Sequence, residues 1–169
     1  MPELQRLRAD HASSILAFEL ANRGYFAGFI SDRGDEFFEH FNERHQNLLA
    51  EQDAGTGAYY VLVAEDGSVI GRFNLMFAEH GVAELGYRVA QRAAGRGVAT
   101  AAVRDLCRLA ARDGIHTIRA AAAYANAASQ RVLFKAGFIP IGPADPAQLG
   151  GKPGTWYQLD LADEPTGDV

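Results

Sequence analysis

Around residue 90 the hydrophobic pattern changes from alternation to helical spacing, across a short glycine-rich segment. Residues 82–89 alternate as a β-strand does, whereas residues 97–112 place their apolar side chains on one face of a helix. Between the two runs stands Ala94-Gly95-Arg96-Gly97-Val98-Ala99-Thr100. A strand that leads through such a segment into an amphipathic helix needs a sheet to pair with and a helix layer packed on it. The pattern therefore predicts a domain that mixes helices and strands.

The glycine-rich segment also has the chemistry of an anion site. Glycine carries no Cβ, so the backbone between Gly95 and Thr100 can approach a ligand closely. The start of the following helix presents unpaired N–H groups and a partial positive charge, which together suit a phosphate or pyrophosphate. Arg92 and Arg96 can add charge-assisted hydrogen bonds at the rim.

Two common nucleotide-binding motifs do not fit this segment. A P-loop requires Lys followed by Ser or Thr after its last glycine, and that pair is missing here. A dinucleotide-binding turn requires a third glycine and an acidic residue about 20 positions later. This sequence has Thr100 in place of that glycine and alanines near position 120. A purely structural tight turn remains an alternative.

The remaining pattern predicts one α+β domain over residues 1–162 and a loose tail over 163–169. We expect a mixed, mostly antiparallel sheet of six to seven strands, flanked by about four helices. The expected strands cover 3–8, 59–65, 69–78, 82–89, 116–124, 138–141 and 155–161. The expected helices cover 11–22 with Asp10 as N-cap, 34–52, 97–112, and 126–135 with Asn126 as N-cap. Residues 142–154, rich in glycine and proline, are expected to form a loop.

The overall charge of −5 hides a strong asymmetry. Residues 86–138 hold nine basic and two acidic side chains, a net charge of +7, and the rest of the chain carries seven basic and nineteen acidic ones, a net charge of −12. Such a basic segment can attract a polyanion locally. No nucleic-acid-binding motif accompanies it, and no apolar run reaches the ~20 residues of a membrane span. The single cysteine, Cys107, fits a small core residue and a reducing, cytoplasmic compartment.

Three blocks of the sequence together resemble a known superfamily. They are Glu84-Leu85-Gly86-Tyr87-Arg88-Val89, the glycine helix start Gly95-Arg96-Gly97-Val98-Ala99-Thr100, and Asn126-Ala127-Ala128-Ser129 followed by Phe134-Lys135-Ala136-Gly137-Phe138. In order and spacing they resemble the GCN5-related N-acetyltransferase (GNAT) superfamily. Within it, they are most similar to the RimJ/RimL-like branch that acetylates the N-termini of ribosomal proteins.

The resemblance implies acetyl-CoA as cosubstrate and a sheet with splayed central strands. The pantetheine arm would lie between the strand ending at Val89 and the strand beginning near His116, and would pair with the backbone of Tyr87, Arg88 and Val89. The implied cofactor-binding residues are Tyr87, Arg88, Val89, Arg92, Gly95, Arg96, Gly97, Val98, Ala99, Thr100, Asn126, Ser129 and Lys135. No metal is implied. The chain departs from the family where Ala94 replaces a leading Gln or Arg, and Arg92 or Arg96 would then supply the missing polar contact.

Acetyl transfer to an amine needs a base, an oxyanion donor and an acid. An alkylammonium group is almost fully protonated at neutral pH, so a base assists the reaction. By resemblance Glu84 is the catalytic base, with Glu79 and His80 in the preceding turn as alternatives. A backbone N–H near Val89 would hold the oxyanion.

The family often has a tyrosine acid at the position of Phe134, and phenylalanine cannot donate a proton. Ser129 is therefore expected to be the catalytic acid, with Tyr124 in reserve.

The acceptor is an amine, and the sequence leaves its identity open. By resemblance, the helices at 11–22 and 34–52 and the loop 142–154 would border its groove. A peptide or protein N-terminus, a small amine such as an amino acid or antibiotic, and a CoA-binding regulatory member without turnover all stay open, as does a structural module that binds no nucleotide. The chain is expected to act as a monomer or homodimer, without nucleic-acid or membrane partners.

Overall fold

A single seven-stranded sheet runs through the protein. The computed structural model describes residues 1–161, and the predicted tail at 163–169 lies outside that range. The sheet order is β1-β2-β3-β4-β5-β7-β6, and every neighbouring pair is antiparallel except β4 with β5. The strands are β1 (Glu3–Arg6), β2 (Gly57–Val63), β3 (Val69–Phe77), β4 (Val82–Val89), β5 (Thr117–Ala123), β6 (Ile139–Ala144) and β7 (Gly154–Asp160). The predicted mixed, mostly antiparallel sheet is confirmed.

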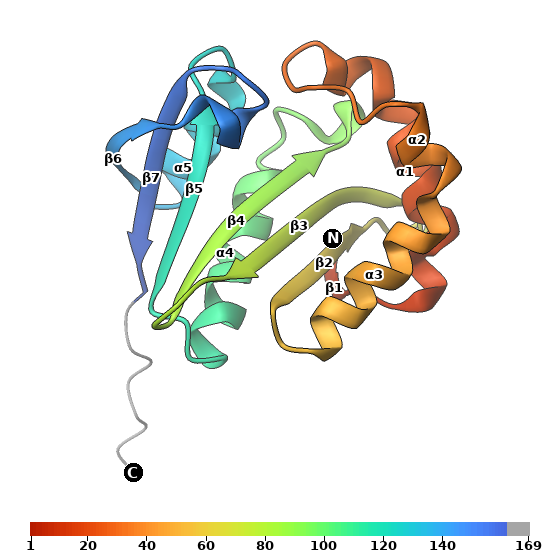
Figure 1. The fold of residues 1–169 in the computed structure, drawn as a ribbon, viewed down its shortest axis with the longest axis horizontal. Helices are drawn as coiled ribbons and strands as arrows, with labels where there is room; N and C mark the ends of the chain where they lie inside the picture. The colour runs from red at the N-terminus through yellow and green to blue at the C-terminus, as the bar shows by residue number, and fades with distance from the viewer. Residues whose placement is uncertain (162–169) are drawn as a thin grey trace.

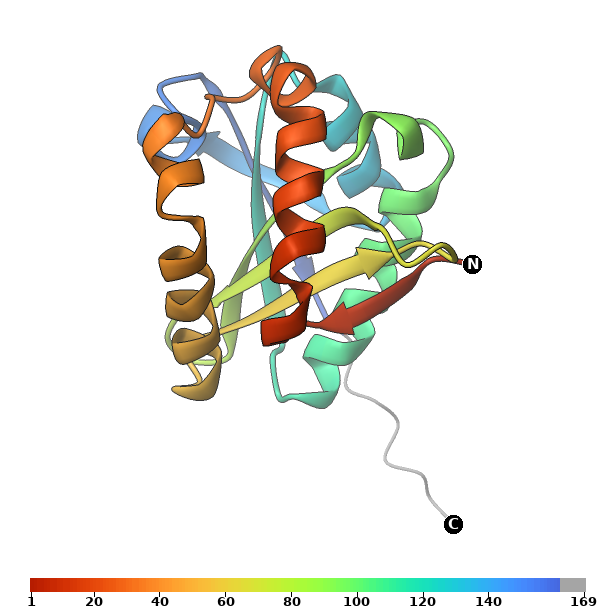
Figure 2. The ribbon, with the colours of Figure 1, turned by 90° about the vertical axis from the view of Figure 1, so that its right-hand side faces the viewer.

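Helices cover the sheet on both faces (Figure 1; Figure 2). The described residues form α1 (Ala12–Ala27), α2 (Asp35–Glu39), α3 (Phe41–Asp53), α4 (Val98–Arg112) and α5 (Ala127–Lys135), with short 3₁₀ helices η1 (Ala9–His11), η2 (Gln91–Ala93) and η3 (Pro146–Leu149). Helices α1, α2 and α3 pack on one face, and α4 and α5 pack on the other. None of the helices within residues 1–161 is long and apolar enough to cross a membrane.

The structure corrects the predicted helices in the N-terminal third. The helix expected at 11–22 extends to Ala27, since Phe26 packs into the core and Gly24 lies in open space. The helix expected at 34–52 is two helices, because His40 leaves helical geometry with φ −108° and ψ 24°. Asp10 is not an N-cap of α1; it lies inside η1, where its carboxylate accepts a hydrogen bond from Arg8.

The segment expected to be a loop at 142–154 is partly ordered. Strand β6 continues to Ala144 and pairs with β7 despite Pro143, which is possible because β6 is the edge of the sheet. The 3₁₀ helix η3 follows, and its Asp145 carboxylate accepts a hydrogen bond from Ala147 N. This part of the chain is therefore held in a defined shape beside the end of β5.

The apolar face predicted for residues 97–112 is confirmed. Helix α4 buries five apolar side chains against the sheet: Ala102, Val103, Leu106, Cys107 and Ala110. Burial raises the pKa of the Cys107 thiol to about 11, so this residue acts as a small core side chain. On the sheet, Phe73, Leu75 and Ile118 are almost completely buried beneath the helices.

The central strands separate halfway along their length. Strands β4 and β5 pair only from Val82 with Thr117 to Leu85 with Ala120. Beyond that point β4 continues to Val89 beside β3, and β5 continues to Ala123 beside β7. The two strands diverge visibly in Figure 1. The predicted splay is confirmed, and it opens one edge of β4.

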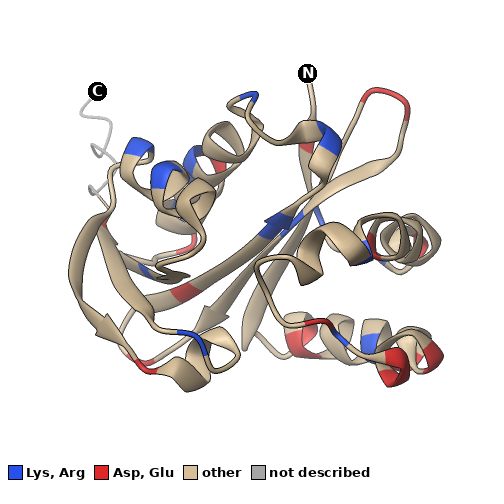
Figure 3. Ribbon diagram, turned by 90° about the horizontal axis from the view of Figure 1, so that it is seen from above, with Lys and Arg blue, Asp and Glu red and all other residues tan. Residues whose placement is uncertain are grey.

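The charge asymmetry in the sequence becomes a difference between the two faces. Basic residues are frequent on α4 and α5, and acidic residues are frequent on α2 and α3 (Figure 3). The exposed basic residues on the first pair are Arg104, Arg108, Arg112, Arg131 and Lys135. The exposed acidic residues on the second pair are Asp35, Glu36, Glu39, Glu43, Glu51 and Asp53. A polyanion is therefore attracted to the α4–α5 face, and a cation to the other.

Candidate active site

The open edge of β4 presents two residues to the gap between the strands. In an antiparallel pair, alternate residues direct both backbone groups to the neighbouring strand. Ala90 N donates to Ile70 O at 2.8 Å and Ala78 N donates to Val82 O at 2.8 Å, so the even-numbered positions of β4 bond to β3. Tyr87 and Val89 therefore direct their N–H and C=O groups away from β3 and into the gap. The same alternation directs the backbone groups of Arg88 to β3.

The glycine segment lies between η2 and α4, where β4 leads into the helix. Gly95 and Gly97 have φ of +75° and +74°, a conformation that L side chains rarely adopt. A Cβ at either position would meet no protein atom within 4 Å, so backbone conformation and room for a ligand account for both glycines. Ala101 N makes the bond to Gly97 O at 3.0 Å, and the N–H groups of the preceding residues 98–100 have no partner within the helix. This is the geometry of an anion cradle.

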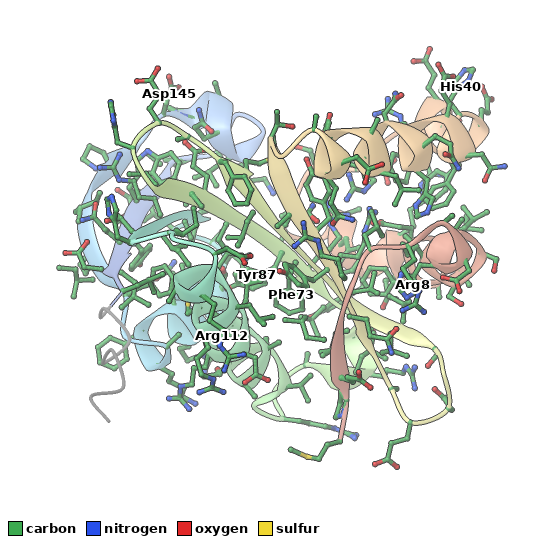
Figure 4. All side chains as sticks on the ribbon, turned by 90° about the horizontal axis from the view of Figure 1, so that it is seen from below. Arg8, His40, Phe73, Tyr87, Arg112 and Asp145 are labelled. Atoms are coloured by element: carbon green, nitrogen blue, oxygen red, sulfur yellow. The ribbon has the colours of Figure 1, made fainter. Side chains whose placement is uncertain are left out.

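Ser129 lies beside β4 and bonds to a tyrosine. Its Oγ is 2.8 Å from the hydroxyl oxygen of Tyr87, and that hydroxyl also donates to Ser129 O at 3.3 Å. Asn126 caps α5 by accepting a hydrogen bond from Ser129 N at 3.2 Å. The Tyr87 ring stacks on Phe73, with ring centroids 5.6 Å apart (Figure 4). The cap and the stacking therefore fix Ser129 and Tyr87 against each other.

Burial raises the pKa of Tyr87 to about 12, and the bond to Ser129 opposes that shift. Tyr87 therefore stays protonated at neutral pH and can support a proton held by Ser129. The sequence placed the backbone of Tyr87 in the site but did not reveal the role of its hydroxyl. The alternation of side chains along β4 could have revealed this role. Tyr87 lies on the same face as the buried Leu85 and therefore points to the helices that follow β4 in the sequence.

Glu84 lies on the other face of β4. The alternation buries Ala83 and Leu85 and leaves Glu84 exposed, in register with Met76 of β3 and Arg119 of β5. Glu84 is the second-to-last residue of β4 that pairs with β5 before the two strands separate. Glu84 and Ser129 therefore approach the opening from opposite faces of the sheet. The alternative bases, Glu79 and His80, lie in the β3–β4 turn, where both side chains are more than 90% exposed.

The remaining predicted contacts lie around the cradle. Arg92 donates to Ser68 Oγ in the β2–β3 turn, and the exposed Arg96 lies between the two glycines. Lys135 ends α5, and its carbonyl accepts a hydrogen bond from Arg104 at 2.7 Å. Tyr124, the reserve acid, is 59% exposed at the end of β5.

A splayed parallel pair in a mixed sheet, with a glycine helix start beside it, defines the acyl-CoA N-acyltransferase architecture. The sequence matches the Acetyltransferase (GNAT) domain over residues 3–139. The chain therefore belongs to the GNAT acetyltransferase family, as its sequence blocks predicted. No curated protein matches the sequence.

Solved structures share the whole fold at low sequence identity. A ribosomal-protein-S5-alanine acetyltransferase from Vibrio fischeri aligns with a TM-score of 0.87 and 21% identity, over 96% of this chain and 94% of that one. RimJ from Mycobacterium smegmatis, in complex with CoA-disulfide, aligns at 0.82 and 22%, over 96% and 83%. A spermidine N-acetyltransferase from Vibrio cholerae, in complex with CoA and spermine, aligns at 0.77 and 16%, over 96% of both chains. At these identities the likeness establishes the fold.

Proposed function

We propose that this protein is an acetyl-CoA-dependent N-acetyltransferase whose acceptor is a primary amine, in particular a peptide or protein N-terminus. The observation that carries the proposal is the open edge of β4 between Tyr87 and Val89, with Glu84 on one face and Ser129 on the other. Membership of the GNAT family and the CoA complexes of similarly folded proteins support acetyl-CoA as the cosubstrate.

The cradle and the open strand edge suit the two parts of a CoA molecule. The N–H groups at residues 97–100 suit its pyrophosphate, and the basic α4–α5 face adds long-range attraction. The backbone of Tyr87 and Val89 suits the amide groups of a pantetheine arm that enters as an extra strand partner. Val89 N–H is then the donor closest to the thioester carbonyl, as an oxyanion donor must be.

The proposed reaction uses Glu84 on one face of β4 and Ser129 on the other. Glu84 accepts a proton from the acceptor ammonium, directly or through water, and the neutral amine attacks the thioester carbonyl. The new C–N bond forms as the C–S bond breaks, and Ser129, supported by Tyr87, protonates the departing thiolate. The second proton of the amine leaves the new amide nitrogen and restores the Ser129 hydroxyl, while Glu84 releases its proton to solvent. An α-amino group has a pKa near 8, so an N-terminus needs less assistance than an alkylamine does.

The α1–α2 loop and the η3 region meet at the open end of the site. Ser31 Oγ donates to Gly150 O at 3.4 Å, so the α1–α2 loop, which joins the two helical regions predicted to border the acceptor groove, touches the predicted border segment 142–154. A narrow entrance on the acceptor side of the proposed site suits the N-terminus of a peptide chain. The similarly folded ribosomal-protein acetyltransferase supports the same reading, and a small-amine acceptor remains the second candidate because a spermidine acetyltransferase shares the fold.

Thiol release from acetyl-CoA, measured across N-terminal peptides and small amines, tests the proposal. We expect Glu84→Gln to lower kcat by about 100-fold and to alter the pH–rate profile, because a general base contributes at least that much. CoA affinity measured by calorimetry should stay unchanged. Glu79→Gln is the matched control, since that carboxylate lies five residues away in the turn and should leave turnover intact. Equal rates for Glu84→Gln and the parent would assign the base elsewhere.

A further inference from the structure

Beyond its last pair with β5, strand β4 has a strand partner on one side only. The last pair joins Leu85 with Ala120, and β4 then continues to Val89. Residues 86–91 are called the β4 arm below. Its open edge carries the backbone groups of Tyr87 and Val89, which the proposed function assigns to the pantetheine arm. Because one edge of the β4 arm lacks a strand, contacts from outside the sheet decide how firmly it is held.

The β4 arm ends at a buried side chain of α1. Asn22 is 9% exposed, and its Oδ1 accepts a hydrogen bond from Gln91 N at 3.0 Å. Its Nδ2 donates to Phe18 O at 2.9 Å, one turn earlier in the same helix. A backbone N–H can only donate and a backbone carbonyl can only accept, so the two contacts fix the orientation of the Asn22 amide.

Asn22 acts as a helix cap that comes from a distant part of the chain. Gln91 is the first residue of η2, and Ala90 before it offers no side-chain cap. The N–H groups at the start of a helix lack partners within that helix. A capping side chain usually supplies the accepting oxygen from the adjacent sequence position. Here the oxygen comes from 69 residues away, so the bond also joins α1 to the end of the β4 arm.

The capped corner lies between the two parts of the predicted CoA site. Ala90 N donates to Ile70 O at 2.8 Å, which continues the pairing of β4 with β3, and Gln91 N is the next donor along the chain. Val89, whose N–H is proposed to hold the oxyanion, lies just before this corner. Gly95 of the cradle lies just after it. A shift of the corner therefore moves the oxyanion donor and the cradle relative to each other.

Helix α1 contacts the β4 arm at a second point. Glu19 lies one turn before Asn22 on the same face of α1, and it is 1% exposed. Its Oε2 accepts a hydrogen bond from Arg88 at 3.3 Å. The Arg88 guanidinium also lies over the Phe26 ring, 4.8 Å from the centroid. The helix therefore holds the side chain of one residue in the β4 arm and the backbone of another.

We propose that Asn22 is a positioning residue for CoA binding. By holding the N–H of Gln91, it sets the position of the Val89 oxyanion donor relative to the glycine cradle. The inference rests on the proposed acetyltransferase function, because it requires CoA to bind along the β4 arm. Asn22 acts through Gln91 and needs no contact with the cofactor.

Calorimetry with CoA alone tests the role of Asn22. We expect Asn22→Ala to lower CoA affinity about tenfold, the worth of one hydrogen bond that positions the site. Ile15→Val is the matched control, because Ile15 is completely buried in the same helix and its shortening removes apolar packing but no polar contact. Thermal unfolding should show both variants less stable than the parent, and Ile15→Val should keep the parent's CoA affinity.

Gln91→Pro removes the same hydrogen bond from its other side. Proline has no N–H and is tolerated at the first residue of a helix. Ala90 already has the extended backbone that precedes a proline, with φ −56° and ψ 145°. In the Gln91→Pro background, Asn22→Ala should cause no further loss of CoA affinity, because the two residues act through one bond. Additive losses would overturn the inference.

Hydrogen exchange relates the affinity to the corner itself. The Gln91 amide should exchange faster in Asn22→Ala than in the parent, and equal exchange would contradict the proposed contact. CoA binding that depends on Asn22, without turnover of any amine, would contradict the proposed function and support the inference. Turnover in the parent, with equal CoA affinity in the parent and Asn22→Ala, would do the reverse. An equal loss of affinity in Ile15→Val would also overturn the positioning role.

Discussion

At the scale of single residues, the side chains of β4 point alternately to the two faces of the sheet. Glu84 and Arg88 point to the face on which α1 packs, while Tyr87 points to Ser129 and the α5 helix. A regular strand is sufficient for this arrangement, because neighbouring side chains point to opposite faces of the sheet. In the proposed reaction, Glu84 as base and Ser129 as acid would therefore act on opposite sides of one thioester without contacting each other.

The contact between the Tyr87 hydroxyl and Ser129 leads to a specific prediction about thiol release. Tyr87→Phe keeps the stacking on Phe73 and removes the 2.8 Å contact to Ser129 Oγ. We expect the single-turnover rate to fall about tenfold, the worth of one hydrogen bond of about 1.4 kcal/mol, with little change in CoA affinity. Rapid-mixing thiol assays measure the rate.

Tyr124→Phe provides the control for that experiment. Tyr124 is exposed at the end of β5, and its loss should leave thiol release unchanged if Ser129 is the acid. A slow Tyr124→Phe beside a normal Tyr87→Phe would transfer the acid role to Tyr124.

At the scale of elements, local sequence rules succeeded where local contacts decide the structure. The glycine turn, the face of α4 and the Asn126 cap depend on residues within a few positions of each other, and all three were predicted. The contacts of the buried Glu19 were missed, because its partners Arg33, Arg72 and Arg88 lie 14, 53 and 69 residues away. The hydrophobic periodicity of a sequence does not show contacts between residues so far apart along the chain. The break at His40 was missed too, since neither glycine nor proline marks it.

The separation of β4 from β5 was neither predicted from local sequence nor missed. No pattern of alternation shows where two strands stop pairing, and the prediction came from the resemblance to a family. The structure places the last pair at Leu85 and Ala120, one residue after Glu84. Family likeness therefore supplied long-range geometry that the residues alone could not.

The start of α4 yields a prediction about the cradle. Gly97→Ala forces an alanine into φ +74°, at a cost of about 1–2 kcal/mol in unfolding free energy. The new methyl group meets no protein atom, so it projects into space available to a ligand. We expect CoA affinity to fall at least tenfold by calorimetry.

Gly55→Ala separates backbone strain from ligand contact. Gly55 has φ +76° and equally open surroundings, but it lies after α3, far along the chain from the cradle. It should show the same loss of stability with unchanged CoA affinity. Equal affinity losses in both variants would mean that strain alone explains the effect.

At the scale of the whole molecule, the helices on the two faces of the sheet carry opposite charge. Basic residues are frequent on α4 and α5, which follow the glycine segment, and acidic residues are frequent on α2 and α3 on the other face (Figure 3). Through its contacts with Arg33, Arg72 and Arg88, Glu19 of α1 joins α1, the α1–α2 loop, β3 and β4 at one point of that second side. Helix α1 and the loop after it are thereby fixed to the two strands.

The N-terminal junction gives the molecule a pH-dependent stability. His11 is 6% exposed; its Nδ1 accepts a hydrogen bond from Arg8 N at 3.0 Å and its Nε2 lies 3.1 Å from Gln5 Oε1. Burial, reinforced by the charge of Arg8, lowers the pKa of His11 below its ordinary 6.5. The unfolded chain therefore binds this proton more readily than the folded one. The contribution of His11 to stability is complete above pH 6.5 and decreases as the pH falls below it.

Urea unfolding between pH 7.5 and 5 measures this contribution. We expect His11→Gln to be less stable than the parent at pH 7.5, because glutamine fills the site of the ring poorly, and the difference to shrink as the pH falls. Protonation of carboxylates affects both proteins alike, so the difference isolates His11. His40→Gln provides the control, because the His40 side chain is 60% exposed and its replacement removes no buried imidazole. A constant gap between His11→Gln and the parent across this range would mean that the buried imidazole keeps its ordinary pKa.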